Sequence, residues 1–93
     1  MATKIVRVHI KGRVQGVWYR GWTVQEAQRA DLNGWVRNHS DGSVEALFAV
    51  LEDSVDAMIE ACHQGPPSAH VDDVVVEPFE GPLTPGFRQL PTV

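Results

Sequence analysis

Residues 34–51 read GWVRNHSDGSVEALFAVL, and this stretch decides the architecture that the sequence predicts. At its centre, Asp41-Gly42 is a strong hairpin signal, because both residues tolerate the positive φ of a tight turn. Short strands are expected on either side, at residues 35–39 and 43–51. The second of these is apolar on both faces, which is typical of a central strand. We therefore expect a β-hairpin within a sheet.

The segment before the hairpin predicts a strand, a loop and a helix. Residues 4–10 alternate between apolar and polar side chains, as in a half-buried strand. Two glycines mark a loop at residues 12–16, and residues 20–30 have the spacing of a helix. The apolar stripe of this helix is expected to contain Trp22, Ala27 and Ala30.

The segment after the hairpin predicts a second helix and another strand. Either Asp53 or Ser54 is expected to cap the helix through its side-chain oxygen. An apolar face recurs at helical spacing, and a Gly-Pro-Pro sequence ends the helix. That face consists of Val55, Met58, Ile59 and Cys62. A valine-rich strand follows at residues 71–77, then a proline-rich loop at 78–86, and residues 87–90 have the pattern of a short fifth strand.

The resulting order is strand, helix, strand, strand, helix, strand. This order predicts an α+β sandwich of the ferredoxin-like type, with a mostly antiparallel sheet and both helices on one face. Residues 1–93 have the length of a single domain, and no linker, repeat or low-complexity stretch divides them. Because this fold carries many functions, it does not identify one.

Composition argues against several classes of protein. The longest apolar run covers residues 46–51, whereas a membrane-spanning helix needs about 20 residues. The first residues lead directly into the first strand, so no signal peptide is expected. The single cysteine, Cys62, rules out an internal disulfide and a Cys-x-x-Cys site, and its place on an apolar helix face favours a small buried side chain. We expect a cytoplasmic protein that binds no membrane.

The net charge of −4 conceals an uneven distribution. Residues 1–37 hold seven Lys or Arg and two acidic residues, whereas residues 38–93 hold one Arg and ten acidic residues. The total discourages an anionic ligand, but the basic first third permits one. Chance unevenness is the simpler explanation of the counts alone, and the acidic residues are expected to lie on solvated surface.

Residues 12–20 read GRVQGVWYR and connect the first strand to the first helix. A loop that leads into a helix N-terminus presents unpaired backbone N–H groups and a positive dipole end, which suit an anion. Gly16 allows the backbone to curl so that successive N–H groups converge, and the guanidinium of Arg20 matches two phosphate oxygens. Taken singly, these are the features of an ordinary loop with an exposed arginine, and the sequence contains neither GxxxxGK[ST] nor GxGxxG.

Asn38, in the hairpin segment, is the second candidate functional residue. Its side chain offers an acceptor and donors, so it can hold a water molecule in one orientation without changing charge. The alternative is an asparagine that satisfies local backbone groups beside the turn.

Two other ligand classes fit the sequence less well. The four histidines do not pair at zinc-finger or His-x-x-x-His spacing, so surface or hairpin positions account for them better than a metal does. The three tryptophans can stack on bases, and this fold hosts RNA-recognition domains. The aromatic motif on the central strands is missing, however, and the second half is acidic. We therefore expect neither a metal nor a nucleic acid.

Two of these segments together resemble a known family. GRVQGVWYR at residues 12–20 and GWVRNHSDGSVE at residues 34–45 closely resemble the two signatures of the acylphosphatases. Arg20 and Asn38 stand eighteen positions apart, as the family pattern requires. GPPSAHV at residues 65–71 is a third, weaker match. Two long motifs in register are far more specific than either loop alone.

The resemblance implies a site and a reaction. The fold would be the ferredoxin-like sandwich with strand order 4-1-3-2, and the reaction would be hydrolysis of an acyl phosphate to a carboxylate and inorganic phosphate. Arg20 and the loop backbone would bind the phosphate, and Asn38 would position the attacking water. No metal or other cofactor is implied, and we expect a monomer that acts on a small-molecule acyl phosphate. The expected phosphate-binding residues are Gln15, Gly16, Val17, Trp18, Tyr19 and Arg20.

The sequence departs from the family pattern at three positions. Tyr19 stands where Phe is frequent, so its hydroxyl needs a partner, and Asp31 stands where Gly often ends the helix. Trp18 is bulky for the loop, and we expect it to be partly buried against the sheet edge rather than to touch the substrate. Two alternatives to an enzyme stay open: a non-catalytic anion-binding or regulatory domain of the same fold and, well behind it, a nucleic-acid module.

Overall fold

The computed structural model describes residues 2–93. The elements in chain order are β1 (Val6–Arg13), α1 (Tyr19–Arg29), β2 (Asn33–Asn38), β3 (Val44–Ala49), α2 (Glu52–Cys62), β4 (His70–Pro78) and β5 (Phe87–Gln89). The predicted order of strands and helices is confirmed, and the short fifth strand is present.

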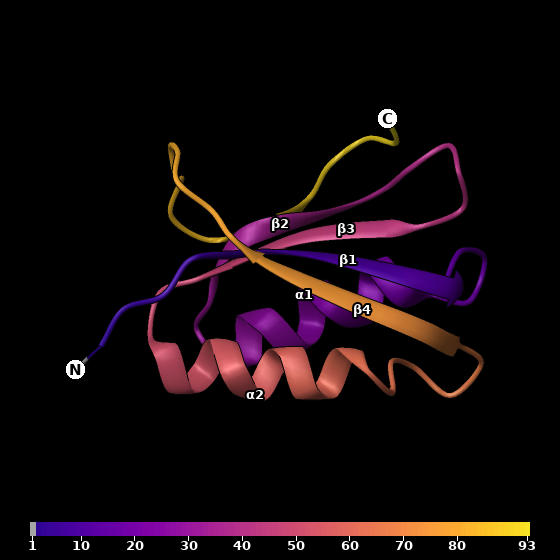
Figure 1. The fold of residues 1–93 in the computed structure, drawn as a ribbon, viewed down its shortest axis with the longest axis horizontal. Coiled ribbons are helices and arrows are strands. Elements are labelled where there is room, and N and C mark those ends of the chain that lie inside the picture. Colours follow the sequence, from indigo (N-terminus) through magenta and orange to yellow (C-terminus); the bar gives the residue numbers. More distant parts are fainter. Residues whose placement is uncertain (1) are drawn as a thin grey trace.

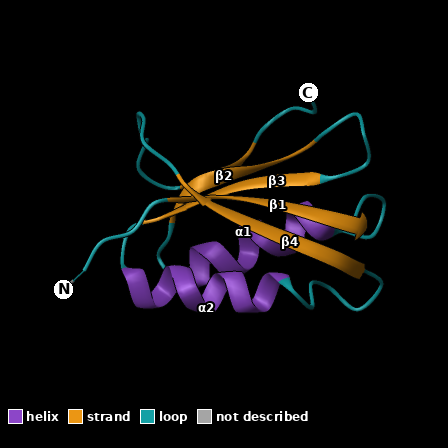
Figure 2. Cartoon of the chain, in the orientation of Figure 1, coloured by secondary structure: helices purple, strands orange, loops and turns teal. Residues whose placement is uncertain are grey.

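The strands form one sheet in the order β4-β1-β3-β2-β5, which confirms the expected order 4-1-3-2 and adds β5 at one edge. β1 lies antiparallel to β3 and β4, β2 lies antiparallel to β3, and β5 runs parallel to β2. Both helices cover the same face of the sheet, as Figure 1 and Figure 2 show. The chain is therefore a two-layer α+β sandwich of the ferredoxin-like type, as predicted.

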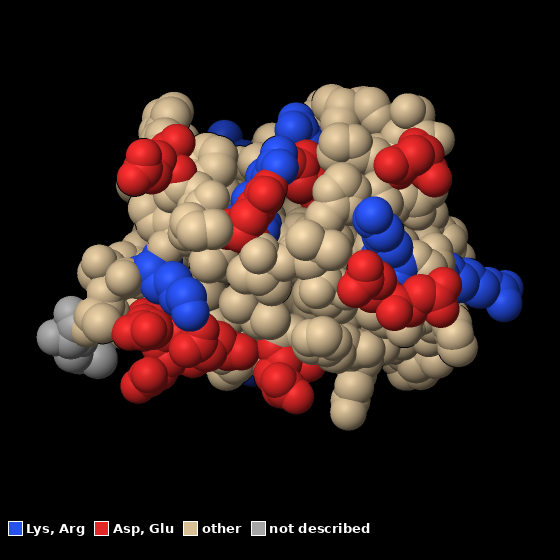
Figure 3. Space-filling view, viewed as in Figure 1, with Lys and Arg blue, Asp and Glu red and all other residues tan. Residues whose placement is uncertain are grey.

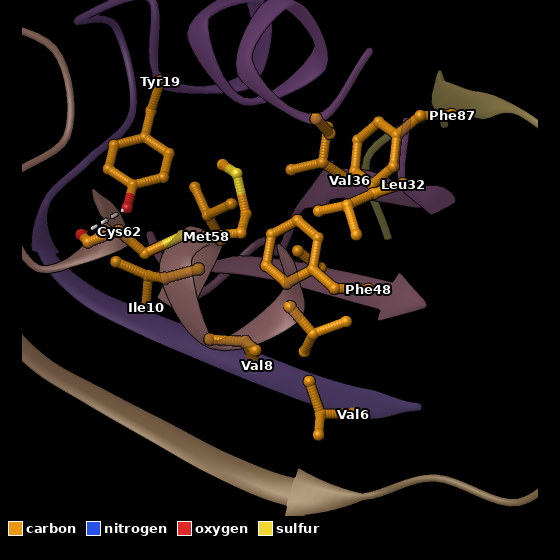
Figure 4. Close-up of a cluster of buried hydrophobic side chains, with 14 of the residues drawn as sticks. Val6, Val8, Ile10, Tyr19, Leu32, Val36, Phe48, Met58, Cys62 and Phe87 are labelled. Atoms are coloured by element: carbon orange, nitrogen blue, oxygen red, sulfur yellow. Dashed lines mark hydrogen bonds between the residues drawn. The ribbon is translucent and has the colours of Figure 1, made fainter. Parts of the chain in front are cut away.

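The core lies between the sheet and the helices. Alternation along β1 buries Val6, Val8 and Ile10 in this layer. Figure 4 shows them in one cluster with Met58 and Cys62 of α2, with Ile10 drawn beside these two residues. All six residues of β3 are buried, which confirms that it is a central strand. Since each fully buried aliphatic or aromatic side chain contributes about 1.5–3 kcal/mol, this layer accounts for most of the stabilisation.

The predicted hairpin joins β2 to β3. The N–H of His39 donates to the carbonyl oxygen of Ser43 at 2.9 Å and closes the turn. Gly42 has a φ of 95°, whereas Asp41 is not among the residues with positive φ. Instead, the Asp41 carboxylate accepts a hydrogen bond from the N–H of Ser43 at 2.9 Å. Only the glycine of the Asp-Gly pair therefore uses the left-handed conformation.

The start of α2 differs from the prediction. The helix begins at Glu52, directly after Leu51, and has no side-chain cap, so the expectation that Asp53 or Ser54 caps it is wrong. The N–H of Glu52 donates instead to the carbonyl of Ala2 at 3.1 Å. A backbone carbonyl thus takes the place of the expected side-chain oxygen. Neither helix in residues 2–93 is long and apolar enough to cross a membrane.

Two details around α1 also differ. β1 continues through Gly12, which was expected in the loop, because Gly12 still pairs with β4 after a shift of register between Lys11 and Gly12. Gly12 has a φ of 128°, and a β-carbon there would lie 2.3 Å from the carbonyl oxygen of His70. The buried face of α1 consists of Tyr19, Thr23 and Ala27, whereas Trp22 and Ala30 of the predicted stripe are only partly buried.

Most acidic side chains are exposed, as expected. Figure 3 shows several groups of acidic side chains on this face, one of them over α2, where Asp53 and Asp56 are exposed. Glu45 on β3 is the one buried acidic residue of residues 2–93, because it is only 3% exposed. It accepts hydrogen bonds from Arg37 at 2.8 Å and from Arg7 at 3.3 Å. The carboxylate and its partners thus form a charged cluster on the sheet face away from the helices.

Candidate active site

The loop before α1 has a left-handed backbone at two positions. Gly16 has a φ of 73° and Trp18 has a φ of 67°. A residue with a side chain pays about 1–2 kcal/mol for this conformation, so Gly16 adopts it at little cost and Trp18 does not. The loop therefore curls at both positions immediately before α1 begins at Tyr19.

The curled loop carries free backbone donors. Within residues 2–93, no N–H from residue 15 to residue 21 donates to a carbonyl or a side chain of the chain. The first N–H of this region with a partner belongs to Trp22, which donates to the Trp18 carbonyl at 3.0 Å. These free N–H groups lie at the positive end of the α1 dipole, where an oxyanion is stabilised.

Tyr19 anchors the loop to α2. Its ring is buried, and its hydroxyl donates a hydrogen bond to the carbonyl oxygen of Cys62 at 2.6 Å, drawn as a dashed line in Figure 4. The expected need for a hydroxyl partner is thus met, and burial raises the pKa of Tyr19 above its ordinary value. Gly65 faces the ring, since a β-carbon there would lie 2.6 Å from a ring carbon. Burial also raises the pKa of the Cys62 thiol to about 12, so this cysteine is a neutral, buried side chain, as predicted.

Asn38 ends β2 on the face that the helices cover. Alternation places it on the same face as Val36, which belongs to the core. Asn38 is 8% exposed, and its Oδ1 atom is buried without a hydrogen-bond partner in the described chain. Its carbonyl is held by the N–H of Val93, which donates to it at 3.0 Å. The side-chain oxygen therefore does not satisfy a local backbone group. An unpaired buried oxygen costs about 1–3 kcal/mol, which points to a water or a ligand as its partner.

Arg20 and Asn38 line the same pocket, which has a volume of about 250 Å³. The lining residues are Val14, Gln15, Gly16, Trp18, Tyr19, Arg20, Gly21, Asn38 and Gln89. Val17 is the one expected phosphate-binding residue that does not line it, because its side chain packs against the core. A larger hollow of about 430 Å³ between α1 and α2 contains no residue of the two motifs expected to carry chemistry.

Comparison with known proteins identifies the family. The sequence profile of the family described as Acylphosphatase matches residues 6–88. This chain belongs to the acylphosphatase family. An acylphosphatase from Rhodospirillum rubrum is 57% identical over 90 residues, which cover 97% of this chain and 99% of that protein.

Solved acylphosphatase structures have the same fold. One from Coxiella burnetii has a TM-score of 0.91 at 32% identity, over 96% of this chain and 94% of that chain. One from Bacillus subtilis has a TM-score of 0.87 at 33% identity, over 92% of this chain and 97% of that chain. Both the resemblance inferred from the motifs and the ferredoxin-like fold are thereby confirmed.

Gln89 lines the pocket although it belongs to neither of the two sequence motifs. It belongs to β5, which lies beside β2 and pairs Gln89 with Val36. This pairing carries Gln89 to the pocket that contains Asn38. The only signal in the sequence was the short strand pattern at residues 87–90, which does not say where the strand lies.

Trp18 also differs from its expected place. Its side chain is 60% exposed and lines the pocket that contains Arg20 and Asn38, so the expectation of partial burial at the sheet edge is wrong. The indole lies against Gly21, because a β-carbon at that position would be 2.1 Å from the indole Nε1 atom. The glycine in the first turn of α1 therefore leaves the room that the ring occupies.

Proposed function

We propose that this chain is an acylphosphatase, which hydrolyses the carboxyl–phosphate bond of acyl phosphates to a carboxylate and inorganic phosphate. Membership of the family supports the reaction. The observation that carries the roles of the residues is the unpaired, buried Oδ1 atom of Asn38, which lies in one pocket with Arg20 and the free N–H groups. A domain that only binds an anion has no need for such an oxygen.

The loop binds the phosphoryl group in this proposal. Its free N–H groups and the guanidinium of Arg20 donate hydrogen bonds to the phosphoryl oxygens. These donors are in place before the substrate arrives, so they stabilise the charge of the transition state without reorganisation. The net charge of −4 does not oppose this binding, because the donors act at short range.

Asn38 orients the attacking water. Its Oδ1 atom accepts a hydrogen bond from the water, so that a lone pair of the water oxygen points at the phosphorus. The bond between water oxygen and phosphorus forms as the bond between phosphorus and the acyl oxygen breaks, with the two oxygens in line. The carboxylate leaves without a general acid, and the water proton passes to a phosphoryl oxygen. Positioning and charge stabilisation thus suffice, with no metal in the proposed reaction.

Turnover of acetyl phosphate by the purified chain, measured in the presence of a chelator, tests the proposal. We expect hydrolysis well above background, and we expect Arg20→Ala to lower kcat/KM by about 100- to 1,000-fold. Cys62→Ala is the control, because the thiol is buried and does not line the pocket, so we expect its removal to leave the rate unchanged. Phosphate binding without turnover would instead support a regulatory anion-binding domain. Salt-sensitive binding to any oligonucleotide would support a nucleic-acid module.

The remaining parts of the proposal concern the setting of the enzyme. We infer that residues 1–93 act as one domain, as a monomer in the cytoplasm, on small-molecule substrates. Light scattering after gel filtration tests the monomer, and a mass of twice 10.3 kDa would contradict it.

A further inference from the structure

Trp18 holds an exposed aromatic ring at the pocket. Its side chain is 60% exposed although it borders the same pocket as Arg20. The left-handed backbone at Trp18 and the space above Gly21 together keep the indole over the first turn of α1. The left-handed backbone disfavours a bulky side chain such as that of Trp18, and a glycine such as Gly21 lowers the helix propensity of the first turn. The indole is therefore held beside the pocket rather than in the core.

The other side chains that line the pocket are either polar or buried. Val14 and Tyr19 line it, but each is only 1% exposed. The other side chains in the lining are those of Gln15, Arg20, Asn38 and Gln89, all of which are polar. Among the described residues of the lining, Trp18 thus presents the one exposed apolar side chain. An acyl phosphate has a charged end and a carbon end, and the pocket offers a matching surface for each.

The burial of the pocket residues indicates how the substrate is oriented in the pocket. In-line displacement places the water and the leaving group on opposite sides of the phosphorus. Asn38 is 8% exposed, so the water that it orients lies at the buried end of the pocket. The acyl group must then lie toward the open end, where Trp18 stands with 60% of its surface exposed. This step rests on the proposed function, because it uses the role of Asn38 in hydrolysis.

We propose that the indole of Trp18 is the contact surface for the acyl group and makes the enzyme prefer aromatic acyl phosphates to acetyl phosphate. An aromatic acyl group stacks on the indole, whereas an acetyl group is too small to cover it. Such a contact is made in the bound substrate as well as in the transition state. It therefore lowers KM for the aromatic substrate more than it raises kcat.

Steady-state kinetics with benzoyl phosphate and acetyl phosphate test this proposal. The measured quantity is the ratio of kcat/KM for the two substrates. We expect Trp18→Ala to lower this ratio by about 3- to 10-fold, mainly through KM for benzoyl phosphate, and Trp18→Phe to retain most of it. Trp35→Ala is the matched control, because this tryptophan lies outside the pocket, beneath the guanidinium of Arg37 at 4.7 Å. An unchanged ratio in Trp18→Ala, or an equal loss in Trp35→Ala, would overturn the proposal.

Binding measurements separate this proposal from the proposed function. If the wild-type chain hydrolyses neither substrate, the enzymatic function fails. Calorimetric titration with the non-hydrolysable analogues benzoylphosphonate and acetylphosphonate then still decides the role of Trp18. Tighter binding of the benzoyl analogue that disappears in Trp18→Ala supports the contact, and equal affinity of the wild type for both analogues contradicts it.

Discussion

The side-chain nitrogen of Gln15 lies 2.7 Å from the carbonyl oxygen of His39 and donates a hydrogen bond to it. The same nitrogen donates a second bond, at 2.9 Å, to the carbonyl of Ser43. Gln15 belongs to the loop that leads to Arg20, and His39 directly follows Asn38. A single amide therefore ties the proposed phosphate-binding loop to the hairpin that carries the proposed water-binding residue.

We expect Gln15→Leu to lower kcat for acetyl phosphate by about 10- to 100-fold, because the two parts of the site lose their fixed separation. The variant retains the volume of the side chain but leaves two half-buried carbonyl groups without this donor. Its free energy of unfolding should also fall by about 1–3 kcal/mol. Kinetics and urea denaturation of the same preparation measure both effects.

Gln28→Leu is the matched control for this variant. The Gln28 amide also donates to a backbone carbonyl, that of Phe87 at 3.3 Å, but it does not line the pocket. We expect a loss of stability with little loss of kcat. If Gln15→Leu loses stability and retains full kcat, then Gln15 only supports the fold and does not position the site.

Asn38→Ala should separate activity from stability. We expect kcat to fall by about 100- to 1,000-fold with a smaller change in KM, since the water loses its acceptor. The free energy of unfolding should stay the same or rise, because the change removes a buried oxygen that has no partner. Kinetics and thermal denaturation check the two effects. A variant with full kcat would show that the role of Asn38 in orienting water is wrong, even if the chain is an enzyme.

The fold and the two motifs could be predicted from the sequence, because each depends on a local pattern of residues. Alternation along β1, the Asp-Gly turn and the helical face of α2 each follow from residues close together in the chain. The spacing of Arg20 and Asn38 identified the family for the same reason, since each lies in a contiguous motif.

The features that the sequence did not predict depend on distant partners. Gln89 reaches the pocket only because β5 pairs with β2, and the strand pattern does not specify that neighbour. Glu45 is buried because arginines on two other strands meet it, whereas a glutamate between apolar residues predicts no particular surroundings. Trp18 is exposed because of its own backbone angle and the space at Gly21.

Glu45 should stabilise the folded chain at neutral pH, and this stabilisation should be lost in acid. Burial by itself raises the pKa of this carboxyl, but hydrogen bonds from His39 at 2.7 Å and from Arg37 outweigh burial and hold the pKa below its ordinary value of 4.5. The ionised carboxylate therefore stabilises the fold fully above this value, and the contribution is lost as the pH falls through the lower pKa of the folded state.

Urea denaturation between about pH 3 and pH 7 measures this contribution. Glu45→Gln should lower the free energy of unfolding at neutral pH by about 1–3 kcal/mol and should flatten the decline below the ordinary carboxyl pKa. Glu80→Gln is the control, because Glu80 is exposed and forms no ion pair in residues 2–93. An equal pH dependence in the wild type and Glu45→Gln would show that other carboxyls cause the acid sensitivity.

Tyr19 offers a direct optical test of the anchor between α1 and α2, because the sequence contains one tyrosine. Burial raises the pKa of its phenol, and the hydrogen bond to the Cys62 carbonyl requires the proton. Its stabilising effect is therefore present below the ordinary phenol pKa of 10.0 and is lost as the pH rises above that value.

We expect the absorbance of tyrosinate to stay absent from the folded protein through the range where a free phenol ionises, and to appear only together with unfolding. The same chain in concentrated urea should titrate at the ordinary value of 10.0. Tyr19→Phe removes the hydrogen bond and retains the ring, so its free energy of unfolding at neutral pH should fall by about 0.5–1.5 kcal/mol. The variant should also lose the part of the alkaline destabilisation that Tyr19 causes. Ordinary ionisation in the folded wild type, as followed by absorbance and circular dichroism together, would mean that solvent reaches the hydroxyl and that Tyr19 does not anchor the loop.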